Sequence, residues 1–94
     1  MIKSFSDQDT ERLFLGQRPK KLPNDIWKRG TRKLLILHAA TALSELRVPP
    51  GNRLEKLAGD RKGEYSIRIN DQWRICFIWR DGHAYHVEIT DYHS

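Results

Sequence analysis

The chain has 94 residues, enough for one domain, and carries 17 Lys and Arg against 12 Asp and Glu, which gives a formal charge of +5. Apolar residues make up 38% and charged residues 31% of the chain, a composition too apolar for a disordered segment and too polar for a membrane span. A single cysteine, Cys76, excludes an intramolecular disulfide and a cysteine-based metal cluster.

The N-terminal sequence and the charge bear on location and partners. No hydrophobic segment follows residues 1–4, so we expect no signal peptide, no membrane partner and a cytoplasmic protein in which residues 1–94 form one domain. A basic excess on so small a domain favours a large polyanionic partner, nucleic acid first, bound on an open face. Many small basic domains bind no anion, so the charge alone does not decide the function.

The first half of the chain predicts two helices. Ser6-Asp7 has the form of a helix N-cap, acidic residues follow in the first turns, and Gly16 offers a stop. A second, longer helix is predicted over about residues 26–45, with an apolar stripe, a basic edge and a weak point at Gly30. A Val-Pro-Pro-Gly-Asn segment ends that helix. Both helices precede every strand-like segment except the short residues 1–5.

The second half of the chain changes to a two-residue period. Apolar and polar residues alternate over residues 65–70, 73–80 and 85–90, which predicts three half-buried strands. Turn-forming residues at 70–72 and 81–83 connect them as an antiparallel meander. We therefore expect an α+β fold, with two N-terminal helices packed on one face of a twisted antiparallel sheet.

Three-residue turns fix the register of this sheet. They put the large apolar residues, Tyr85 among them, on the core face, and on the other face they place Arg68 opposite Arg74 and Ile78 beside His86. Two directly opposed arginines cost stability unless an anion relieves them. The pair is thus either a phosphate clamp or two side chains that extend separately into water.

The chain end supplies the second candidate group. Asp91-Tyr92-His93 follows the last strand onto the rim of the sheet near Arg74. An imidazole transfers protons near neutral pH, an aromatic ring stacks on a base, and a carboxylate orients either one. Terminal residues often fray, so only the proximity to Arg74 gives this motif weight. No spacing of histidines predicts a metal site, and Cys76 has no base partner, which favours a structural role.

Several segments of the chain resemble HigB-type toxins of the RelE/ParE superfamily of type II toxin–antitoxin systems, namely residues 1–5, 50–61, 65–70, 72–77, 87–89 and 91–93. The resemblance covers almost the whole chain. It implies the RelE-like microbial ribonuclease-type fold and a ribosome-dependent endoribonuclease that inhibits translation by cleaving mRNA in the A site, without a metal or cofactor. It also implies a HigA-like helix-turn-helix antitoxin as partner, with operator DNA bound only through the antitoxin complex.

The resemblance assigns the activity to Arg74, Asp91, Tyr92 and His93. In the corresponding chemical hypothesis, the mRNA 2′-hydroxyl attacks the neighbouring phosphate while Arg74 and Arg68 stabilise the growing negative charge. His93 transfers a proton and is oriented by Asp91, and Tyr92 stacks on or positions a base.

RNA binding is expected from a set of basic side chains: Arg68, Arg53, Lys56, Arg61 and Lys62. The chain departs from the family pattern at two positions. Some members carry a His and a Lys before the Gly-Asp pair, and this chain has Glu55 and Ala58 there. Either Lys56 supplies the charge or Glu55 acts as an auxiliary acid or base.

Two other functions stay open at this point. A ParE-like relative would poison DNA gyrase, although such a toxin has no need of the Asp91-Tyr92-His93 ending. A toxin without catalysis would act only as a regulator with its antitoxin on DNA, and Glu55 and Ala58 favour that alternative.

Overall fold

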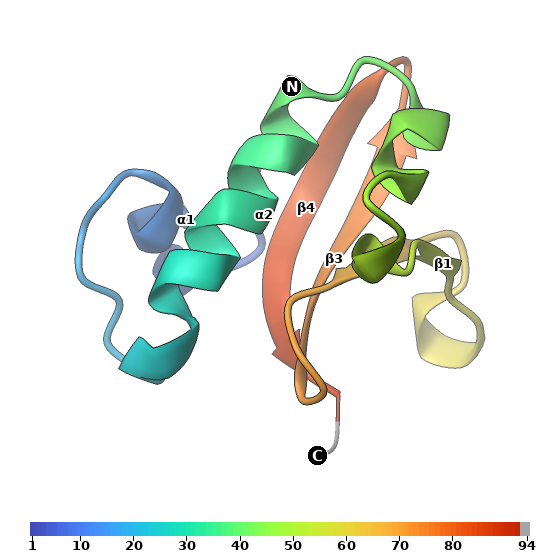
Figure 1. The fold of residues 1–94 in the computed structure, drawn as a ribbon. Coiled ribbons are helices and arrows are strands. Elements are labelled where there is room, and N and C mark those ends of the chain that lie inside the picture. Colours follow the sequence, from blue (N-terminus) through green and yellow to red (C-terminus); the bar gives the residue numbers. More distant parts are fainter. Residues whose placement is uncertain (93–94) are drawn as a thin grey trace.

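The computed structural model describes residues 1–92, in which two α-helices lie on one side of a four-stranded antiparallel sheet (Figure 1). The helices are α1 (Gln8–Phe14) and α2 (Trp27–Ala39). The strands pair in sequence order: β1 (Glu55–Lys56), β2 (Tyr65–Arg68), β3 (Trp73–Arg80) and β4 (His83–Asp91). Short 3₁₀ turns occupy Asn24–Ile26, Leu43–Arg47, Pro50–Asn52 and Gly59–Arg61. The predicted α+β class is confirmed, and none of these helices is long and apolar enough to cross a membrane.

Helix α1 forms where the capping pattern predicts it. Asp7 is the N-cap, and its Oδ2 accepts a hydrogen bond from the backbone N–H of Thr10 at 3.2 Å. The helix ends at Phe14, and Gly16 follows with a φ of +78°, a left-handed conformation that costs glycine nothing.

Helix α2 is shorter than predicted, because it ends at Ala39 and does not continue to Glu45. The backbone turns extended at Ala40, and the Glu45 carboxylate then accepts the N–H groups of Thr41 and Ala42 at 2.6 and 3.1 Å. These bonds, the one from Thr41 first, hold the pKa of Glu45 below its usual value. A side chain that satisfies backbone donors in this way competes with the helix, which is why the long apolar stretch breaks.

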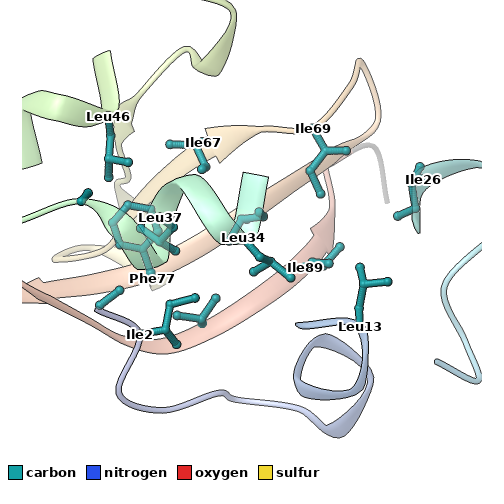
Figure 2. Packing of buried hydrophobic residues seen from close by; sticks show 14 of the residues in the cluster. Ile2, Leu13, Ile26, Leu34, Leu37, Leu46, Ile67, Ile69, Phe77 and Ile89 are labelled. Carbon is teal, nitrogen blue, oxygen red and sulfur yellow. The ribbon is translucent and has the colours of Figure 1, made fainter. Parts of the chain in front are cut away.

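The core lies between α2 and the sheet. Leu34 and Leu37 of α2 are fully buried, and Figure 2 shows them among the apolar side chains of the strands and of Leu13. Gly30 lies at the closest point of this packing, since a Cβ there would lie 3.1 Å from Leu13 Cδ2 and 3.7 Å from Ile89 Cδ1. The glycine that weakens the helix thus permits its close approach to α1 and β4.

Replacing Gly30 with Val should lower the free energy of unfolding by about 1–3 kcal/mol, because the added methyl groups overpack this contact. Helix propensity works in the opposite direction, so a loss isolates the steric effect. Urea denaturation measures it, with Leu35→Val on the exposed side of α2 as a control that should stay within about 0.5 kcal/mol of wild type. A variant as stable as wild type would contradict the packing argument.

The predicted register between β2 and β3 is confirmed. Arg68 pairs with Arg74 and Ile67 with Ile75 across the turn at residues 70–72. The Asn70 side chain shapes that turn, because its Oδ1 accepts the backbone N–H groups of Gln72 and Trp73 at 2.9 and 2.7 Å.

The turn between β3 and β4 differs from the prediction. It contains two residues, Asp81 and Gly82, whose φ values of +53° and +80° are typical of a type I′ turn. Ile78 therefore pairs with Tyr85 and not with His86, and Tyr85 leaves the core face. His86, with a φ of +53°, forms a bulge that restores the predicted register farther along the strands.

The segment after α2 also contains a strand that the sequence did not predict. Glu55 and Lys56 form β1, in which Glu55 pairs with Ser66 of β2. Cross-strand partners share one face of a sheet, so Glu55 and Ser66 lie on the face opposite the helices, together with Cys76 of β3.

Candidate active site

The side chain of Arg74 forms the centre of this face. It is 6% exposed, and its Nε donates to Ser66 Oγ at 2.8 Å. Its Nη2 donates to the carbonyl oxygens of Arg53 at 2.6 Å and of Ser66 at 3.4 Å. The guanidinium is therefore held against the sheet by the protein and does not extend into water.

The local fold explains how these acceptors reach Arg74. Ser66 lies on β2, next to β3, and is fully buried. Arg53 closes the 3₁₀ turn Pro50–Asn52 in a left-handed conformation, with a φ of +43°, which costs a non-glycine residue about 1–2 kcal/mol. That conformation directs the carbonyl group of Arg53 to the guanidinium.

Two further predicted residues lie beside Arg74. Glu55 Oε2 is 3.8 Å from Arg74 Nη2, and the ring centroid of Tyr92 is 5.3 Å from Arg74 Cζ. Tyr92 is half-exposed and is fixed by a 2.7 Å hydrogen bond from its N–H to the carbonyl of Gln72. A buried cation, a half-exposed carboxylate and a half-exposed aromatic ring thus meet at one site.

Arg68 does not share this site in the way the clamp hypothesis expected. It pairs with Arg74 in the ladder, but its guanidinium forms an ion pair with Asp71. The repulsion between the two arginines is relieved by the chain's own oxygen atoms, so no external anion is needed for stability. The alternative of two arginines extended into water is wrong for Arg74.

Arg61 also has partners within the chain. Its guanidinium lies 2.8 Å from Glu88 and 3.1 Å from Glu64, and the hydrogen bond to Glu88 is the main reason that its pKa is raised. These ion pairs fasten the 3₁₀ turn Gly59–Arg61 to β4. Lys62 is exposed.

Lys56 and Arg53 are found at a different place. With Arg47 and Tyr65 they line a hollow of about 610 Å³ beside β1. The side chains of Arg47, Arg53 and Lys56 form no ion pair with the described residues. Sequence reasoning missed Arg47, which ends the 3₁₀ turn Leu43–Arg47 and lies just beyond the predicted end of the second helix.

The C-terminal motif is described only in part. Asp91 Oδ2 accepts a hydrogen bond from Gln72 Nε2 at 2.9 Å, and Asp91 pairs with Trp73, so it belongs to the helix-covered face of the sheet and not to the face of Arg74. The predicted His93 lies outside the described residues. Among residues 1–92, no three His, Cys, Asp or Glu side chains are grouped as a metal site would require.

Cys76 lies on the same face as Ser66 but is inaccessible. It is fully buried, and burial raises the pKa of its thiol, so the thiol stays protonated near neutral pH. This agrees with the structural role expected for it.

Native protein should therefore resist alkylation of Cys76 by iodoacetamide, whereas denatured protein should be labelled to completion. Mass spectrometry of the intact chain measures both. Rapid labelling of the native state would show a reactive thiolate and reopen a nucleophilic role.

The fold is also found in a solved structure. Over the whole chain it superposes on 99% of a chain from the YoeB–YefM complex of Staphylococcus aureus, with a TM-score of 0.55 and 22% identity. At this identity the likeness shows the fold alone. The family described as "RelE-like toxin of type II toxin-antitoxin system HigB" matches residues 3–93.

Individual relatives agree with this class. The chain is 46% identical to Toxin HigB-1 of Vibrio cholerae over an alignment of 85 residues. This alignment covers 89% of this chain and 90% of the relative. It is 35% identical to Endoribonuclease HigB of Proteus vulgaris, with 99% of this chain and 100% of the relative covered. The chain belongs to the HigB-like family of RelE-like toxins of type II toxin–antitoxin systems.

Proposed function

We propose that this toxin is an endoribonuclease that cleaves mRNA on the translating ribosome, without a metal, and thereby inhibits translation. The observation that carries the proposal is the fixed Arg74 guanidinium with the half-exposed Glu55 and Tyr92 beside it. The name of the Proteus vulgaris relative, Endoribonuclease HigB, supports the same activity.

The proposed reaction is an internal transesterification of RNA. The 2′-oxygen attacks the adjacent phosphorus as its proton passes to Glu55, and the P–O5′ bond breaks. The leaving 5′-oxygen takes a proton from His93, which yields a 2′,3′-cyclic phosphate and a 5′-hydroxyl. Arg74 stabilises the charge on the nonbridging oxygens in the transition state, and Tyr92 stacks on a base.

The ribosome supplies what so small a site lacks. An in-line arrangement of 2′-oxygen, phosphorus and 5′-oxygen is costly for a flexible single strand, and an mRNA held on a ribosome is already ordered. This explains why the cleavage should depend on translation.

Basic side chains around the site would hold the RNA. The hollow with Arg47, Arg53 and Lys56 lies on one side. Lys33 of α2, which donates to the side chain of Asn52 next to Arg53, has a lowered pKa, caused by burial and then by Arg29, Arg32 and Arg68. So dense a group of cations is stabilised by phosphate groups, and binding to ribosomal RNA should weaken with salt.

The decisive test is cleavage of a reporter mRNA in a translating extract, compared with the same mRNA without ribosomes. Wild type should cut only when ribosomes translate, and Arg74→Ala should lower the rate by about 100-fold or more, because the charge that stabilises the transition state is lost. His93→Ala should lower it as well.

Arg12→Ala is the matched control and should cut normally, because Arg12 is a partly exposed cation on α1, on the helix side of the sheet. Intact mRNA in every reaction would overturn the proposal and turn attention to gyrase. Cutting by Arg74→Ala at the normal rate would show that another group stabilises the phosphate.

A type II toxin has an antitoxin as partner, and the helices offer a docking surface for it. Phe14, Trp27 and Leu35 line a largely apolar groove of about 560 Å³ between α1 and α2. Leu35 is 52% exposed and is continuous with Phe14 and Trp27 in the groove, which Arg18 and Lys28 also line.

We infer that an acidic amphipathic segment of a HigA-like helix-turn-helix antitoxin occupies this groove, with its apolar side on Leu35 and its carboxylates near the two cations. The helices that line the groove lie on one side of the sheet (Figure 1). By the strand register, Arg74 is on the opposite face, together with Ser66 and Cys76. Such an antitoxin would inhibit by blocking access to the ribosome, and the toxin would reach operator DNA only through the complex.

Leu35→Glu should weaken antitoxin binding by about 10-fold or more, because it places a charge in the apolar centre of the contact. Leu15→Glu is the matched control, since Leu15 is 59% exposed but does not line the groove. Calorimetric titration of the purified toxin with antitoxin measures both, and equal affinities for the two variants would exclude this docking site.

A further inference from the structure

The guanidinium of Arg74 has more donors than the protein uses. An arginine carries five N–H groups, one on Nε and two on each terminal nitrogen. Ser66 Oγ accepts from Nε, and the carbonyls of Arg53 and Ser66 both accept from Nη2. Nη1 has no acceptor among the described residues, so its two N–H groups are left for a ligand.

The acceptors of Arg74 differ in charge from those of its neighbours. Arg68 is paired with the Asp71 carboxylate, and Arg61 with the carboxylates of Glu64 and Glu88. Arg74 is held at hydrogen-bond distance by a hydroxyl and two carbonyls, all of which are neutral, while Glu55 stands farther off at 3.8 Å. Neutral oxygens fix the direction of a guanidinium without cancelling its charge.

From this contrast we propose that Ser66 is a positioning residue for the reaction, and that its hydroxyl sets the orientation in which Arg74 meets the scissile phosphate. The proposal rests on the proposed ribonuclease function. Ser66 is 0% exposed and so does not touch the RNA itself. It acts through Arg74, together with the carbonyl group of Arg53.

The physical gain comes from order established before the substrate binds. A free arginine side chain holds about 2 kcal/mol of rotamer entropy, and a donor that must still find its place stabilises a transition state poorly. With Nε and Nη2 engaged, the remaining Nη1 donors keep one direction throughout the reaction. This is the electrostatic preorganisation that acyl- and phosphoryl-transfer sites depend on.

The experiment compares wild type with Ser66→Ala, Ser66→Thr and Ser66→Cys. Ser66→Ala removes the acceptor, and Ser66→Cys nearly keeps the volume but offers only a weak sulfur acceptor. In both variants kcat for ribosome-dependent cleavage should fall by about 10- to 100-fold, with KM within about twofold, because a misplaced group affects the reaction more than binding. Ser66→Thr retains the hydroxyl and should restore most of kcat.

A second readout reports the contact without any activity. In nitrogen-15 NMR spectra, the Nε–H signal of Arg74 should be protected from solvent exchange in wild type and in Ser66→Thr. That protection should be lost in Ser66→Ala and Ser66→Cys, while the backbone spectrum stays that of the folded protein. If Ser66→Ala does not fold, the Ser66→Cys variant carries the comparison.

The outcomes separate the two proposals. Wild-type kcat and an unchanged Arg74 Nε–H signal in Ser66→Ala, with Arg74→Ala inactive, would overturn the positioning role alone. Normal cleavage by Arg74→Ala would overturn the catalytic role of Arg74 and, with it, the positioning role of Ser66. A folded Ser66→Thr that is as slow as Ser66→Ala would also contradict the role of the hydroxyl.

Discussion

A guanidinium keeps its charge at every physiological pH, so burying one requires oxygen atoms placed to receive its N–H groups. In this toxin that requirement organises the segment between the long helix and the sheet. Asn52 is fully buried, donates to the carbonyls of Leu46 and Val48 at 3.2 Å each, and accepts from Lys33 of α2. The turn that presents the Arg53 carbonyl is thereby fastened to the core, and the direction of Arg74 depends on packing several residues away.

The basic residues of the chain fall into groups with different physical states. The positive charge of those paired with carboxylates, such as Arg61, is largely compensated within the chain, so these residues contribute little net field. Basic residues without carboxylate partners, such as Arg47 and Lys56, keep an uncompensated positive charge at the protein surface. Net charge alone therefore says less about a polyanion partner than the distribution of carboxylates around each cation does.

The sequence predicted the structural features that follow from repeating patterns, such as strand register. It missed the features that depend on individual contacts. The pairing of Arg68 with Arg74 followed from a three-residue turn and the alternation of apolar residues, and it is confirmed. The end of α2 was misplaced, because the helix gives way to hydrogen bonds from one glutamate. Ser66 was overlooked because a small polar residue on a strand normally indicates a face turned to solvent, and here it is buried under an arginine.

The length of the turn between β3 and β4 was also mispredicted. Asp81 and Gly82 form a common hairpin signal, but the third residue, His83, was counted into the turn, and the bulge at His86 then corrected the register. A bulge has no distinct pattern in one sequence, because it needs only one residue that tolerates a positive φ. The positions of Arg74, Thr90 and Glu88 were predicted well despite this error, since they lie beyond the bulge.

The N-terminal residues bear on the tendency of the toxin to aggregate when no antitoxin is bound. Lys3 N–H donates to the Ala84 carbonyl at 2.8 Å and Val87 N–H donates to the Ser4 carbonyl at 3.0 Å, so the outer edge of β4 is occupied by the chain itself. The opposite edge is β1, which has two residues and is too short to recruit another strand. Open sheet edges are where small β-rich proteins join into aggregates. Residues 1–92 of the toxin thus present no long strand edge to which a strand of another chain could add.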